Sequence, residues 1–134
     1  MPQVQSPTNK LYAACGIAIA GGVNDAATHI ALDKGSMAAF DETTNAPASE
    51  ATEDGLTRAA ATVTTEDTTV TDDTTKATHE FTCGVAGPVT IKGFLVMTAA
   101  SNGNCLMWCA FASDQNLENG DKLTCTGNMQ FKKD

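Results

Sequence analysis

Hydrophobic and polar residues alternate with a period of two in the C-terminal half of the chain. Between Ala77 and Cys83, the odd-numbered residues are apolar or aromatic, and the even-numbered residues are Thr and Glu. Residues 123–131 alternate in the same way, with Thr, Asn and Gln at the polar positions. Because successive side chains of a β-strand point to opposite faces, both segments are predicted to be strands with one buried face.

Two segments between these strands are apolar on both faces. Residues 89–98 and 105–112 are separated only by residues 99–104, which include Ser, Asn and Gly. This arrangement predicts a β-hairpin. Strands with two apolar faces need cover on both sides, so the hairpin is expected to lie in the middle of its sheet or beneath another subunit.

The N-terminal half has shorter and more polar strand patterns. Residues 11–20 and 28–33 are candidate strands, and residues 56–65 and 68–75, rich in Thr and Ala, suit half-exposed strands around an acidic turn at Glu66-Asp67. The pattern predicts about eight short strands and no long helix. We therefore expect an all-β fold, an antiparallel two-sheet sandwich of the jelly-roll type.

Two stretches lack a strand pattern. Residues 1–10 contain two prolines among polar residues and are predicted to form an extended N-terminal arm, with residues 11–134 as a single sandwich domain. Residues 34–55 are predicted to form a long loop. A loop of this length exceeds the ordinary ceiling of about 15 residues, so it is expected to be functional or to pack against a neighbour.

Composition narrows the possible partners. Sixteen acidic and eight basic residues give a net charge of −8, and the largest basic cluster is Lys132-Lys133. Binding to nucleic acid or to an anionic membrane is disfavoured, because both need a basic surface. The apolar run at residues 11–20 follows polar residues and is too short to span a bilayer, so we expect a buried strand and synthesis in the cytoplasm of a host cell.

The sequence offers little for catalysis or for a cofactor. None of the motifs HExxH, GxSxG, GxxxxGK[ST] and GxGxxG occurs, and neither His29 nor His79 has a partner at metal-ligand spacing. We expect His79 to pack at the edge of the core, although a Cys–His pair of His79 with Cys83 or Cys125 stays open. We expect the acidic pairs in the loops to be solvated, and calcium binding is the alternative. The chain is therefore predicted to be neither an enzyme nor a cofactor protein.

The cysteines are odd in number, so at least one has no partner within the chain. If Cys105 and Cys109 share a strand, their separation of about 13 Å is too large for a disulfide. We expect small buried residues kept reduced, although the sequence leaves their oxidation state open. The five are Cys15, Cys83, Cys105, Cys109 and Cys125.

Several strand-and-turn patterns resemble those of small bacteriophage virion proteins. They are Gly93-Phe94 before the tip Ser101-Asn-Gly-Asn104, the turn Gly120-Asp121-Lys-Leu123, and Ile30-Ala-Leu-Asp33 followed by a long loop and Gly55-Leu-Thr-Arg-Ala59. The resemblance implies a sandwich or jelly roll that decorates or cements a capsid or forms a fibre or tail part. It carries over no catalytic residue.

The leading hypothesis is a capsid decoration or cement protein on the outer surface of the virion, where it bridges neighbouring major capsid subunits. The arm, the long loop and the doubly apolar hairpin motivate it, because such features are readily buried against other chains. The alternative is a receptor- or glycan-binding module of a phage tail fibre or host adhesin. We also expect a homo-oligomer, as a dimer or trimer. The residues expected to contact partners are Pro2, Val4, Pro7, Leu11, Tyr12, Met37, Phe40, Phe94 and Trp108.

Overall fold

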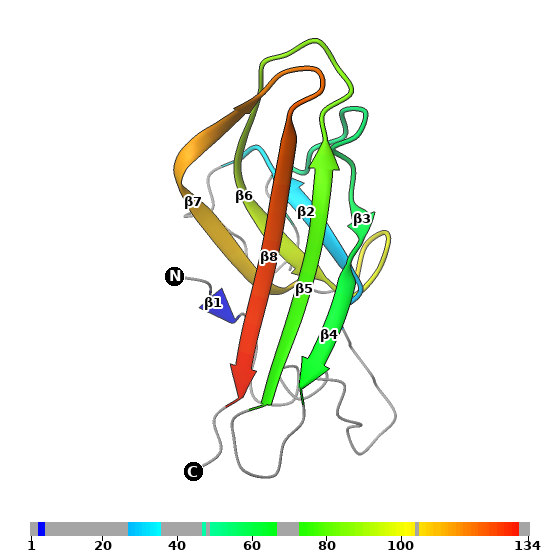
Figure 1. Cartoon of the computed structure of the whole chain (residues 1–134), viewed down its shortest axis with the longest axis vertical. Helices are drawn as coiled ribbons and strands as arrows, with labels where there is room; N and C mark the ends of the chain where they lie inside the picture. The colour runs from blue at the N-terminus through cyan, green and yellow to red at the C-terminus, as the bar shows by residue number, and fades with distance from the viewer. Residues whose placement is uncertain are drawn as a thin grey trace.

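The computed structural model consists of β-strands arranged in two antiparallel sheets (Figure 1). It describes residues 3–4, 27–35, 47, 49–66, 73–103 and 105–131. The five-stranded sheet has the order β1 (Gln3–Val4), β7 (Cys105–Leu117), β6 (Val89–Met97), β2 (His29–Asp33) and β3 (Ala59–Ala60). The three-stranded sheet has the order β4 (Thr62–Glu66), β5 (Asp73–Thr82) and β8 (Lys122–Phe131). The predicted all-β sandwich is confirmed.

The connectivity of the described strands differs from the predicted jelly roll. In a jelly roll, successive strands mostly alternate between the sheets. Here β4 and β5 form one antiparallel pair, β6 and β7 form another, and each pair lies within a single sheet. The connections β3–β4, β5–β6 and β7–β8 cross between the sheets, whereas β4–β5 and β6–β7 do not. The jelly-roll prediction is therefore corrected to a sandwich built from hairpins that each stay in one sheet.

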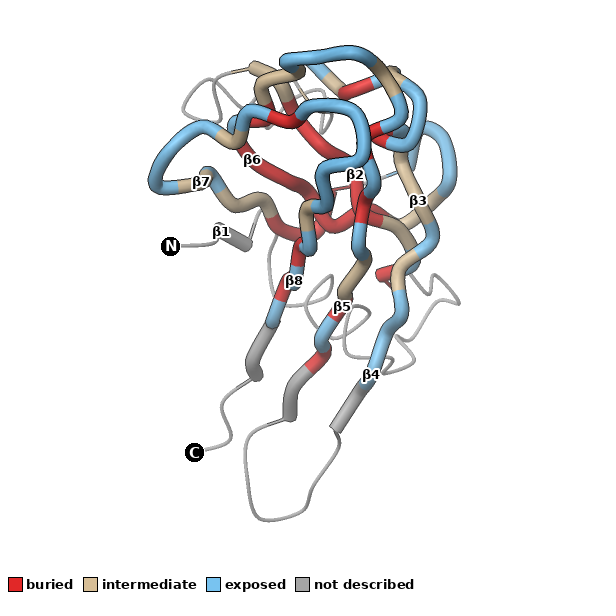
Figure 2. The backbone as a smooth tube through the Cα atoms, turned by 45° about the horizontal axis from the view of Figure 1, so that its top comes forward, coloured by how far each residue is buried: buried red, intermediate tan, exposed pale blue. Residues whose placement is uncertain are grey.

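The prediction of half-buried strands in the C-terminal half is confirmed. Along β5 and just beyond it, Ala77, Phe81 and Cys83 are buried, whereas Glu80 and Thr82 are exposed. Strand β8 alternates in the same way, with Cys125 and Gly127 buried and its Thr and Asn neighbours exposed. The buried faces of both strands meet the five-stranded sheet, and the main core lies between the two sheets (Figure 2).

Strand β6 lies between β7 and β2, and residues on both of its faces are buried. One face contributes Ile91, Phe94 and Val96 to the main core. The other face contributes Leu95 and Met97 to a second cluster with Ala31 and Cys105. The predicted central position of this strand is confirmed, and both of its faces are covered within the single chain.

The chain changes sheets at Ala61. Strands β3 and β4 flank this residue, and β3 belongs to the five-stranded sheet while β4 belongs to the three-stranded one. The Ala61 N–H donates to the Thr28 carbonyl oxygen at 2.9 Å, which ties the corner to the start of β2. The strand predicted over residues 56–65 thus begins only at Ala59. Residues 54–56 form a turn instead, with Gly55 in the left-handed region at a φ of 77°.

The strands predicted at residues 11–20 and 68–75 can be followed only in part. Residues 11–20 lie outside the described residues, and the description of β5 begins at Asp73. The register pairs Glu66 with Thr74, so the connection between β4 and β5 is longer than the tight turn predicted at Glu66-Asp67.

Candidate functional site: a hairpin tip held by Arg58

The connection between β6 and β7 ends in an exposed tip. Residues 100–103 are exposed, and Asn102 and Gly103 have φ angles of 54° and 71°. The left-handed region is accessible to Gly without steric cost, and Asn tolerates it better than most residues. Two such residues in succession reverse the chain, so the predicted hairpin is confirmed at its tip as well as in its strands.

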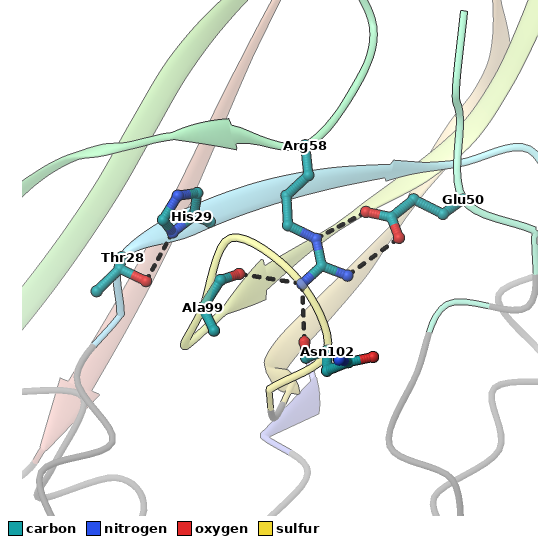
Figure 3. Close-up of polar contacts among 6 residues, drawn as sticks. All are labelled: Thr28, His29, Glu50, Arg58, Ala99 and Asn102. Carbon is teal, nitrogen blue, oxygen red and sulfur yellow. Dashed lines mark hydrogen bonds and ion pairs between the residues drawn. The ribbon is translucent and has the colours of Figure 1, made fainter.

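The guanidinium group of Arg58 holds this tip from one side (Figure 3). Its Nη1 donates to the carbonyl oxygens of Ala99 at 3.0 Å and of Asn102 at 2.8 Å. Its other nitrogens bind the carboxylate of Glu50 in a two-pronged contact, Nε to Oε1 at 2.7 Å and Nη2 to Oε2 at 3.0 Å. One side chain therefore joins the segment of residues 50–58 to a hairpin tip that lies more than 40 residues further along the chain.

Burial makes these contacts stronger than a surface ion pair. The Arg58 side chain is 8% exposed and that of Glu50 is 29% exposed. Bidentate arginine–carboxylate contacts are geometrically specific, and lysine has no planar fork with which to replace them. The carbonyl oxygens of Ala99 and Asn102 point at a fixed donor, so the backbone of the tip is held in one conformation.

Asp33 positions Glu50 at the base of the long loop. The Asp33 carboxylate is buried, and its Oδ1 accepts the N–H groups of Gly35 at 2.8 Å and Ser49 at 2.9 Å. The backbone of Asp33 also bridges to that of Glu50. The chain therefore leaves β2 and returns to it at the same place, and a buried carboxylate closes the loop at both ends.

The segment between Glu50 and Arg58 is fixed by three kinds of contact. Leu56 is fully buried in the main core. Gly55 lies so close to the end of β5 that a Cβ atom there would collide with the Thr82 carbonyl oxygen. The Gly84 N–H donates to the Asp54 carbonyl oxygen at 2.9 Å. This segment is therefore anchored to both sheets, which gives Arg58 a rigid base.

Glu50 and Glu53, two acidic residues of this segment, form ion pairs with nearby basic side chains. Lys34 donates to Glu53 at 2.7 Å, and this hydrogen bond holds the pKa of Glu53 below its usual value.

Within the described residues, no group of three or more His, Cys, Asp or Glu side chains is arranged to hold a metal ion. No helix in the described part of the chain is long and apolar enough to cross a membrane.

A sequence profile of a phage protein family, podophage GP4 fibre I protein gp80, matches residues 22–130. The match spans more than three quarters of the chain and includes β2 to β8, apart from the last residue of β8. The chain belongs to this family. A search of curated proteins finds no match. The broader expectation of a structural virion protein of a bacteriophage is thus supported by membership in a fibre-protein family.

Most residues that the sequence predicted to contact partners lie outside the described part of this fibre-family chain. Val4 lies in β1, where its backbone pairs with Met107. Phe94 is 5% exposed and packs against Phe111, with ring centroids 5.8 Å apart. Trp108 is partly buried against the second core cluster. The six outside the described residues are Pro2, Pro7, Leu11, Tyr12, Met37 and Phe40.

The Cys–His pair suggested by the sequence is brought together but is poorly suited to nucleophilic chemistry. His79 and Cys125 are directly opposite each other in the β5–β8 register. Burial, with a smaller contribution from Cys109, raises the pKa of the Cys125 thiol to about 12, so the thiol stays protonated at neutral pH. His79 instead makes an edge-to-face contact with Phe81 at 4.6 Å. The described cysteines are free thiols, and Cys15 lies outside the described residues.

Arg58 belongs to one of the patterns that resemble phage virion proteins, but the sequence predicted no role for it. The available signal was its uniqueness, because it is the only arginine among eight basic residues. Its partners gave no signal, since Glu50 is one of many acidic residues and the two carbonyl oxygens belong to the backbone.

Proposed function

We propose that this chain is a subunit of a bacteriophage fibre and that the hairpin tip held by Arg58 contacts a receptor on the host cell. The single observation that carries the location is the fibre-family match over residues 22–130. The choice of the tip comes from its geometry.

The tip has the properties of a recognition loop on a rigid scaffold. Ser101, Asn102 and Gly103 are exposed, and the backbone behind them is fixed by the buried guanidinium group of Arg58. Loops held in this way lose little conformational entropy when they bind, which favours affinity. The hydroxyl, amide and backbone groups offer hydrogen bonds and no charge, so we expect a neutral polar ligand such as a surface glycan.

A capsid decoration protein shares the virion location but differs in the position on the particle. Immunogold electron microscopy of intact particles, with antibody raised against the purified chain, distinguishes the two. Label on fibres supports the proposal, and label distributed over the head supports the decoration role.

The receptor contact is tested by competition for adsorption. Purified chain added to host cells is expected to slow adsorption of the phage, because it occupies the receptor. A Ser101→Lys variant is expected to lose at least ten-fold in this inhibition, because it places a long charged side chain at the centre of the tip. Asn119→Lys is the matched control, since Asn119 is exposed in the turn between β7 and β8.

Equal inhibition by the Ser101→Lys variant and the wild-type chain would assign receptor binding to a different surface. Absence of inhibition by wild-type chain at saturating concentration would argue against receptor binding by this subunit altogether.

A further inference from the structure

The edge strands of the two sheets differ in length and regularity. In the five-stranded sheet, the edge strands β1 and β3 are two residues each. Its long strand β7 carries a large bulge, which is visible in the register with β6. Ile91 of β6 pairs with Gln115 and Gly93 pairs with Ala110, so two steps along β6 correspond to five along β7. Short edge strands and bulges are devices that prevent pairing with another chain.

The three-stranded sheet lacks these devices. Strand β8 is ten residues long and pairs with β5 in an unbroken register from Lys122 to Phe131. Its other side pairs with no described strand, and the same holds for the outer side of β4 (Figure 1). Neither strand contains a proline or a bulge. Such edges present rows of N–H and C=O groups that are ready to pair with another strand.

Both edges are also uncharged where they run level with each other. The register aligns Thr62 of β4, Thr78 of β5 and Thr126 of β8 in one row. Within these two edge strands, the charged residues are Glu66, the last residue of β4, and Lys122, the first residue of β8. In a chain with a net charge of −8, copies repel each other least at such surfaces.

The directions of the strands specify how two copies fit. Strands β4 and β8 both run antiparallel to β5, so they run parallel to each other. Rotation of a copy about an axis along the strands therefore brings β8 of one copy beside β4 of the next in parallel, with their rows level. One repeated contact of this kind uses both open edges, whereas a two-fold contact between two β8 strands leaves β4 open.

We propose that β8 of each copy pairs in parallel with β4 of a second copy of this chain, which joins the three-stranded sheets into one continuous sheet around a closed ring. Val63 supports this assignment, because it is the large hydrophobic residue that the described surface exposes, at 37%, and it lies on β4. The contact does not involve the hairpin tip, so it stands or falls separately from receptor binding.

The test measures the mass of the full chain in solution by light scattering. The wild-type chain is expected to have at least twice the 13.9 kDa mass of one copy. A variant with both Thr62→Lys and Thr126→Lys is expected at the mass of one copy, because its lysines meet across the contact. Within one chain these positions are two strand spacings apart, about 10 Å, so the charges are largely screened at physiological salt. Thr57→Lys, on an exposed turn, is the control and is expected to keep the wild-type mass.

A charge-paired variant separates repulsion from a folding defect. Thr62→Glu with Thr126→Lys changes the same two positions and is expected to regain the wild-type mass, because opposite charges then meet across the strands. Circular dichroism is expected to show the same β-spectrum for both double variants. A wild-type chain at the mass of one copy, a doubly lysine-substituted chain that stays assembled, or a charge-paired chain that stays dissociated would each overturn the proposal. Dissociation by Thr126→Lys alone, with Thr62→Lys alone still fully assembled, would overturn β4 as the partner of β8.

Discussion

Arg58 shows how one side chain determines the conformation of a distant loop. It lies just before β3, but its guanidinium group reaches Glu50 on one side and the β6–β7 tip on the other (Figure 3). Since the tip supplies only carbonyl oxygens, the specificity of the contact comes from the donor.

Replacement of Arg58 by Ala is expected to lower the free energy of unfolding by about 1–3 kcal/mol, because it removes a half-buried ion pair and the donor for two carbonyl oxygens. Arg58→Lys is expected to recover part of this loss, since it keeps the charge without the fork. Urea denaturation measures both values. Hydrogen exchange of the amides at residues 98–103 is expected to become faster in Arg58→Ala, and unchanged exchange there would argue that the tip is held by other contacts.

The buried thiol of Cys125 makes stability depend on pH in the alkaline range. Its pKa is about 12 in the folded chain, above the ordinary value of 9.0. Between these values the unfolded chain releases the proton and the folded chain keeps it, so the unfolded state binds fewer protons. Stability is therefore complete below pH 9 and is expected to fall as the pH rises from 9 toward 12.

Urea midpoints measured from pH 7 to pH 11 test this dependence. Cys125→Ala is the control, and it is expected to show a smaller loss between pH 9 and pH 11 because the titrating group is absent. An equal alkaline loss in both chains would assign the effect to other groups.

At the scale of elements, the sandwich depends on a close approach of its two sheets at Gly127. A Cβ atom at this position of β8 would lie 2.6 Å from Cγ2 of Val96 on β6. The glycine is therefore a packing requirement in the strand, because the neighbouring sheet occupies the space that a side chain needs.

Gly127→Ala is expected to destabilise the chain by roughly 1–3 kcal/mol through overpacking. Combined with Val96→Ala, which removes the opposing methyl groups, the loss is expected to be smaller than the sum of the two single losses. A double-mutant cycle by urea denaturation gives this coupling energy. Strict additivity would show that the two residues do not compete for the same space.

At the scale of the whole molecule, charge and edges act together. A net charge of −8 makes free copies repel each other, and the contact that we propose between copies lies on edges that are uncharged apart from their end residues Glu66 and Lys122. The expectation that the N-terminal arm contacts a neighbouring chain stays a prediction. Gln3 and Val4 pair with Trp108 and Met107 of the same chain, where they add a strand beside β7.

The sequence by itself determined the all-β class, the half-buried strands β5 and β8, the central β6 and the position of the β6–β7 tip. These features follow from side-chain periodicity and from turn residues, which are local properties of the chain. A family-like pattern of turns was also enough to indicate a phage virion protein.

Only the tertiary structure decided the connectivity, the corner at Ala61 and the role of Arg58. Each depends on residues that are distant in sequence, such as Ala99 and Asn102 for Arg58, or Thr28 for Ala61. Periodicity specifies which face of a strand is buried, but it carries no information on which strand lies next to it. Backbone carbonyl oxygens are present at every residue, so the ones that an arginine binds are determined by the packing of the sheets.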